Sequence, residues 1–193
     1  MDTNRLEAFS DGVFAIIITI MVLELKSPIG VQWVSLRPLI AEFLSYALSF
    51  IFIGIYWNNH HHMLYASEKI NGRILWANLH LLFWLSLTPF VTRWMGDNGF
   101  ASLPVALYGV ILLMAAFSYF ILAHALVAHN GSQSKLAAAL GKDYKGVISI
   151  IIYAVAIPLA FFNPLIACFF YVAVAIMWFI PDSRIENALK SEQ

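Results

Sequence analysis

Hydrophobic residues fall into six long runs along the chain, and short polar segments separate them. The runs cover approximately residues 8–26, 38–64, 72–95, 103–129, 146–162 and 164–181. They lack the alternation of a half-buried strand, and a bilayer admits only helices and closed barrels. Because a crossing takes about 20 apolar residues, the pattern predicts an all-α integral membrane protein with six transmembrane helices. The short loops leave no room for a soluble domain, so residues 1–193 are predicted to form a single transmembrane domain.

Prolines mark places where the predicted helices should bend or end. Asn163 and Pro164 can end one helix and begin the next, so the last two runs are predicted to form a tight hairpin whose arms are short for a full crossing. Pro158 predicts a kink in the fifth helix, and Pro89 predicts a kink near the outer end of the third. The loop SKLAAALGKDYK, at residues 134–145, can form a short surface helix.

Lysine and arginine are distributed unevenly between the two ends of the predicted bundle. With six crossings, both termini and the loops at 65–72 and 130–146 share one side, and the opposite side carries only Lys26, Arg37 and Arg93 of the 11 basic residues. Cytoplasmic loops are enriched in lysine and arginine, so we expect a multi-pass protein of the cell membrane with both termini cytoplasmic. The acidic residues around Arg5 are unlike a cleavable signal peptide, and the first helix is expected to be retained.

Composition narrows the function classes further. Apolar residues make up 61% of the chain and charged residues 11%, and the formal net charge is zero, so no basic surface for nucleic acid is expected. The expected partners are the lipid bilayer, a small ion or solute, and other copies of the chain. Cys168 is the single cysteine, which excludes an internal disulfide. The ATPase, metalloprotease and esterase motifs and the TVGYG filter are absent, and neither an enzyme nor a cofactor is predicted.

Polar residues at the start of the first run are informative because they are costly near hydrocarbon. Ser10 or Asp11 can cap the helix there, and Arg5 can pair with an acidic neighbour. At 100° per residue, Asp11 points about 140° away from Ile16, so it would face neighbouring helices and need a donor. Arg5 or a histidine of the second run is the natural candidate. The apolar face around Ile16 can serve helix packing or line a pore, and it comprises Ile16, Thr19, Ile20 and Leu23.

Three consecutive histidines, at positions 60–62 in YWNNHHHMLY, lie near the cytoplasmic end of the second predicted helix. Adjacent helical side chains point about 100° apart, so the three cannot converge on one metal ion, and no metal site is predicted. They are either interfacial histidines in a wet boundary or part of a functional network. In the second case His60 is the best candidate to pair with Asp11.

Two segments together resemble a known family. Arg5, Phe9, Ser10 and Asp11 form an R-x-x-x-F-S-D motif, GVFAIIITIMVLEL follows it, and the second run contributes Trp57 and His60 in YWNNHHHM. This combination is similar to the endosomal and lysosomal potassium channels, specifically their prokaryotic members. The resemblance implies six helices per subunit, a homotetramer, and a pore lined by the first helix of each subunit with a hydrophobic constriction.

The resemblance also implies roles for individual residues. By distance from the motif, Ile16 would form the narrowest ring, with Ile20 and Leu23 above it and the hydroxyl of Thr19 between. The residues expected to hold the pore helix through polar contacts with its neighbours are Arg5, Phe9, Ser10, Asp11, Trp57 and His60.

The expected function is a leak-type ion channel with a modest preference for potassium over sodium. A hydrophobic ring can block ions by dewetting, and potassium loses its water at lower cost than sodium. Two alternatives remain open. A proton-coupled or small-solute carrier could use Asp11 and the histidines as a relay, and a membrane enzyme or scaffold could bind metal at the histidines.

Overall fold

The computed structural model describes residues 3–67, 69–131, 134, 136–137 and 144–179, and its regular structure there is helical. Six of the described elements are longer helices that coincide with hydrophobic runs or with parts of them. The remaining described elements are a 3₁₀ helix and a short α-helix. In chain order they are α1 (Thr3–Leu23), η1 (Trp33–Leu39), α2 (Ile40–Tyr65), α3 (Gly72–Ser86), α4 (Thr88–Asp97), α5 (Ser102–Asn130), α7 (Tyr144–Phe162) and α8 (Pro164–Phe179). Most of the predicted surface helix at 134–145 lies outside the described residues.

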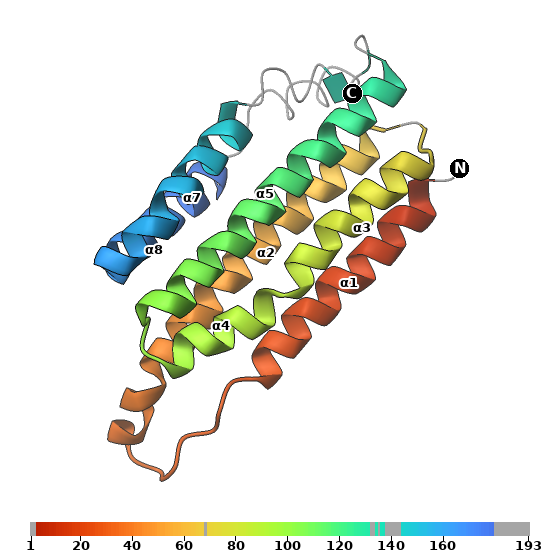
Figure 1. Ribbon diagram of the computed structural model, residues 1–193. Coiled ribbons are helices and arrows are strands. Elements are labelled where there is room, and N and C mark those ends of the chain that lie inside the picture. The colour runs from red at the N-terminus through yellow and green to blue at the C-terminus, as the bar shows by residue number, and fades with distance from the viewer. Residues whose placement is uncertain (1–2, 68, 132–133, 135, 138–143, 180–193) are drawn as a thin grey trace.

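The helices run up and down in one bundle. Figure 1 shows α1, α2, α3 and α5 side by side, with α7 and α8 paired at one edge. By length and hydropathy, five helical stretches can cross a membrane, and α8 is a shorter apolar helix of 16 residues. The five stretches are Thr3–Leu23, Trp33–Tyr65, Gly72–Asp97, Ser102–Asn130 and Tyr144–Phe162. The prediction of an all-α membrane protein is therefore confirmed.

The third hydrophobic run forms two helices instead of one kinked helix. α3 ends at Ser86 and α4 begins at Thr88, because Pro89 lacks an amide hydrogen and its ring would collide with the carbonyl four residues earlier. The Thr88 carbonyl accepts a hydrogen bond from Thr92 Oγ1 at 2.7 Å. The predicted disruption at this position is confirmed, and Figure 1 shows that α4 changes direction relative to α3.

The hairpin between α7 and α8 is as tight as predicted. α7 ends at Phe162, α8 begins at Pro164, and the Asn163 side chain accepts a hydrogen bond from the Leu165 amide at 3.0 Å. α7 continues through Pro158 as one helix.

Two clusters of buried side chains hold the bundle together. One joins α1, α2, α3 and α5 and includes Phe14, Ile17 and Leu81. The other joins α2, α4, α5, α7 and α8 around buried aromatic rings, including Tyr108 and Tyr171. α2 and α5 contribute to both clusters and so connect the helices around α1 with the α7–α8 pair.

The contact between α5 and α8 depends on the absence of a side chain at Gly109. A Cβ atom there would overlap the hydroxyl oxygen of Tyr171, which donates a hydrogen bond to the Val105 carbonyl at 3.1 Å. We expect Gly109→Ala to lower thermal stability by about 1–3 kcal/mol through overpacking, measured by melting of purified protein in detergent. Gly54→Ala on α2 is the matched control, because nothing lies within 4 Å of a Cβ at that position. Equal melting temperatures for the two variants would contradict this packing argument.

Candidate functional site

The first helix has two distinct faces. Its buried residues, at intervals of three and four, are Leu6, Ser10, Phe14, Ile17 and Met21, and they face the bundle. The opposite face is exposed in the subunit and carries the residues that the sequence projection grouped together. Ile16 is 59% exposed, Ile20 42% and Leu23 77%. We call this exposed face, with Thr19, the α1 stripe.

Thr19 is the polar member of the α1 stripe. Its hydroxyl donates a hydrogen bond to the Ala15 carbonyl at 2.7 Å, one turn earlier on the same helix. This bond satisfies the hydroxyl hydrogen and leaves the oxygen lone pairs available on the exposed face. The stripe thus offers an oxygen ligand between apolar side chains.

Asp11 is bound by a residue that differs from the predicted donors. Trp57 Nε1 on α2 donates to Asp11 Oδ1 at 2.9 Å. The predicted pairing with His60 is wrong, because the His60 side chain is fully buried about one turn further along α2 and contacts Asn78 instead. The alternative pairing with Arg5 is also wrong, since Arg5 is exposed and makes no ion pair among the described residues. Phe9 is likewise exposed, at 54%, and lies outside these contacts.

Ser10 and His60 meet through a third residue that the sequence analysis missed. Asn78 on α3 donates to Ser10 Oγ at 3.0 Å, and its carbonyl oxygen lies 2.7 Å from His60 Nε2. All three side chains are fully buried. A lone asparagine within the apolar run of α3 was the available signal, because an amide in hydrocarbon requires partners.

The hydrogen-bond pattern assigns the tautomer of His60. The Asn78 amide nitrogen donates to Ser10, so its carbonyl oxygen faces His60 and must accept. Nε2 therefore carries the hydrogen, and Nδ1 of the neutral ring is an acceptor. Nδ1 has no hydrogen-bond partner in the described residues, and the Phe14 ring packs edge-on against the imidazole with centroids 5.6 Å apart.

His61 points away from the His60 site, as helical geometry predicted. His61 Nδ1 lies 2.6 Å from Glu7 Oε1 on α1, and its ring stacks with those of Trp57 and Tyr65. Among the described residues, no group of three side chains could hold a metal ion. The N-terminal end of α1 is thus tied to α2 and α3 by Glu7, Ser10 and Asp11.

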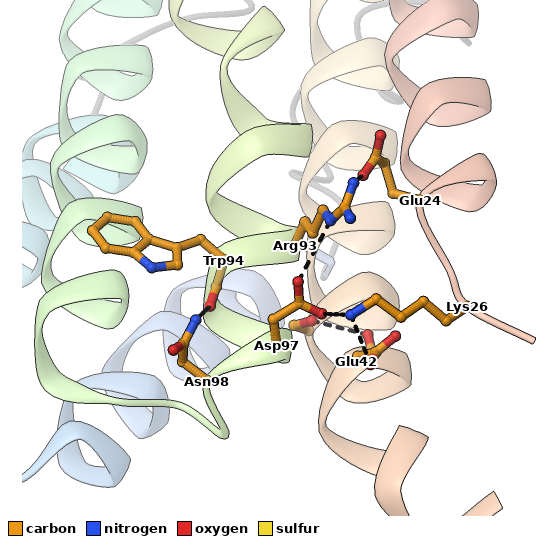
Figure 2. A network of polar contacts seen from close by, with 8 residues as sticks. Glu24, Lys26, Glu42, Arg93, Trp94, Asp97 and Asn98 are labelled. Atoms are coloured by element: carbon orange, nitrogen blue, oxygen red, sulfur yellow. Dashed lines mark hydrogen bonds and ion pairs between the residues drawn. The ribbon is translucent and has the colours of Figure 1, made fainter. Parts of the chain in front are cut away.

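The opposite end of α1 is tied to the bundle by charges. Figure 2 shows a series that alternates in sign: Glu24, Arg93, Asp97, Lys26 and Glu42. Glu24 pairs with Arg93, Lys26 Nζ lies 2.6 Å from Asp97 Oδ1, and Lys26 reaches Glu42 at 3.8 Å. The hydrogen bond to Asp97 raises the pKa of the Lys26 ammonium, so Lys26 stays charged at neutral pH. We call these five residues the outer charge series, because the distribution of basic residues in the sequence predicts that this end lies on the outer side of the membrane.

The fold and these contacts define a multi-pass helical membrane protein whose first helix is fixed at both ends and presents an exposed apolar stripe. Residues 5–89 match the family described as the endosomal/lysosomal potassium channel TMEM175. The chain is 56% identical over 190 residues to a potassium channel of Chryseobacterium sp. (strain P1-3), covering 98% of this chain and 99% of that protein. It is 36% identical over 103 residues to a potassium channel of Chamaesiphon minutus, covering half of each chain.

A solved structure agrees with the fold. The crystal structure of a lysosomal potassium-selective channel TMEM175 homolog from Chamaesiphon minutus matches with a TM-score of 0.79 and 28% sequence identity. The match covers 92% of this chain and 96% of that chain. This chain belongs to the TMEM175 family as a prokaryotic member. The family is one of channels, so the expectation that the chain is not an enzyme is confirmed.

Proposed function

We propose that this chain forms a potassium channel of the cell membrane, as a homotetramer in which the α1 helices surround a central pore. The potassium channels among its relatives support potassium as the transported ion. The observation that carries the placement of the pore is the α1 stripe: Ile16, Ile20 and Leu23 are exposed on a helix whose other face is buried and whose two ends are anchored.

The polar contacts of α1 give it a defined rotation. The buried bond between Ser10 and Asn78 and the bond between Asp11 and Trp57 lie on the side of α1 that faces α2 and α3. Turning the helix to bring the stripe inward would leave the buried amide of Asn78 without its partner, at a cost of about 1–3 kcal/mol. The stripe therefore faces away from the subunit core. In the proposed tetramer it faces the other copies of the chain.

Ion passage in this proposal is limited by the cost of removing water from the ion at the constriction. Four Ile16 side chains would form a constriction narrower than a hydrated ion, so that passage requires loss of water or widening of the ring. Potassium sheds its water at lower cost than sodium, and the Thr19 oxygens would replace part of the lost hydration. Both effects favour potassium modestly, which gives a leak-type channel with a preference for potassium over sodium.

The orientation follows from the basic residues. The end of the bundle that carries the start of α1, the α2–α3 connection and the α5–α7 connection is rich in lysine and arginine. We assign this end to the cytoplasm, which places the outer charge series at the opposite membrane surface.

A proton-coupled carrier is less well supported. Such a carrier would use Asp11 and the histidines as a relay, yet Asp11 binds the Trp57 indole and His60 binds Asn78. Among the described residues the carboxylate that a histidine contacts is Glu7, which pairs with His61, so Asp11 has no histidine partner there.

The placement of the pore is tested by thiol chemistry. In a Cys168→Ser chain reconstituted in liposomes, potassium flux through Ile16→Cys is expected to be blocked by silver ions, because a thiolate ring would bind the metal in the conduction path. Val22→Cys is the control, since Val22 is exposed on α1 but points about 120° away from Ile16. Equal sensitivity of the two variants would remove Ile16 from the pore, and saturable slow flux in the unsubstituted chain would favour the carrier.

A further inference from the structure

The outer end of α1 has less apolar packing than the rest of the helix. Met21, 2% exposed, is the last buried residue of α1, and Leu23 is 77% exposed. The backbone then makes two more helical hydrogen bonds, from the amides of Glu24 and Leu25. Within the described residues, Glu24 and Lys26 supply the ion pairs of this end, and both reach α4.

In contrast, α4 is firmly seated on its neighbours. Gly96 lies so close to α2 that an added Cβ would be 2.8 Å from the Glu42 Cα atom. Thr92 and Ser49 share a buried hydrogen bond of 2.6 Å, and the hydroxyl of Tyr108 on α5 approaches Ser49 at 3.1 Å. The break before α4 allows this short helix to turn toward α2, so α4 is a fixed platform beside a weakly packed helix end.

The outer charge series bridges from this platform to α1. Arg93 and Asp97 stand one turn apart on α4 and bind each other at 3.5 Å. Arg93 pairs with Glu24, and Asp97 pairs with Lys26 (Figure 2). Two side chains of α4 therefore bind two residues that follow the end of α1. Lys26 also reaches Glu42, whose side chain is only 14% exposed. Every charge in the series has an oppositely charged neighbour.

We propose that Arg93 and Asp97 are positioning residues for the pore helix: by holding Glu24 and Lys26 they fix the radial position of Leu23 and so the outer width of the pore. This inference rests on the proposed function, in which α1 lines the pore. The residues touch no ion in the proposal and act through α1. Single exposed ion pairs are weak, and the loss of one pair shifts an equilibrium by up to about fivefold.

The first test measures how often the end of α1 opens, and it does not depend on ion flux. Hydrogen exchange is followed by mass spectrometry in nanodiscs for the unsubstituted chain and for Arg93→Gln. We expect the amides of Glu24 and Leu25 to exchange faster in the variant, by about fivefold, because opening the helix end no longer breaks an ion pair. Arg37→Gln is the matched control, since it removes the same charge at the same end of the bundle from an exposed 3₁₀ helix. Arg93→Lys, which keeps the charge, should restore most of the protection.

The second test compares potassium and sodium flux for the same variants, with Ile16→Asn measured alongside. Arg93→Gln is expected to change the potassium-to-sodium flux ratio while Arg37→Gln leaves it unaltered, and both proteins should melt at the same temperature. Unchanged exchange at Glu24 and Leu25 would overturn the inference. Altered exchange with an unaltered flux ratio would overturn it too, provided that Ile16→Asn alters flux. If Ile16→Asn has no effect, the proposed pore is wrong, and the inference about its width is wrong with it.

Discussion

Replacing Ile16 with asparagine is expected to raise potassium flux by about tenfold and to reduce the discrimination against sodium. In the proposed tetramer the change introduces four amides at the constriction, which keep it wet and offer oxygen ligands to either ion. A reduction of about 1.4 kcal/mol in the barrier is sufficient for a tenfold faster passage. The measurement is flux through purified protein in liposomes loaded with one ion at a time.

The control for this prediction is Val22→Asn. Val22 is 45% exposed on the same helix, outside the α1 stripe, and the substitution is the same change from an apolar side chain to an amide. Only Ile16→Asn should alter the ratio of potassium to sodium flux. A larger effect of Val22→Asn would place another face of α1 in the conduction path.

Replacing Asn78 with leucine is expected to destabilise the subunit by about 2–4 kcal/mol and to reduce recovery of the assembled protein. Asn78 joins three helices, because it binds Ser10 of α1 and His60 of α2 from its place on α3. Leucine has similar bulk but leaves the His60 Nε2 hydrogen buried without an acceptor. The measurement is thermal melting together with the oligomeric state after purification.

Asn59→Leu provides the matched comparison, since the Asn59 side chain donates to the Ile55 carbonyl of its own helix at 2.8 Å. It should destabilise much less than Asn78→Leu. The double variant His60→Leu with Asn78→Leu should recover part of the loss, because both partners of one buried bond are then removed together. Additive losses in the double variant would contradict the coupling between these two residues.

Local signals explain what the sequence alone could predict. The two faces of the first helix follow from its 100° repeat, so the projection separated Asp11, which contacts Trp57 on α2, from Ile16, which is exposed. The break at Pro89 and the hairpin at Pro164 follow from the missing amide hydrogen of proline. Each of these features depends on residues within one or two turns of each other.

Contacts between distant segments explain what was missed. Asp11 and Trp57 are 46 positions apart and Lys26 and Asp97 are 71 apart, and no local repeat indicates which of several polar side chains will meet. His60 was a reasonable partner for Asp11 by residue type, but its position one turn beyond Trp57 points it at Asn78 instead. The outer charge series was not predicted, because it forms only when α4 turns toward α2, and that turn is a tertiary feature.

The separation of α1 from the α7–α8 hairpin has an evolutionary consequence. α7 and α8 pack on α5 and on each other, while the polar contacts of α1 are made with α2, α3 and α4. A substitution in the hairpin therefore reaches the polar contacts of α1 only through intervening helices. At exposed apolar positions of the hairpin, such as Phe162 and Phe169, we expect relatives to differ from one another without a change in those contacts.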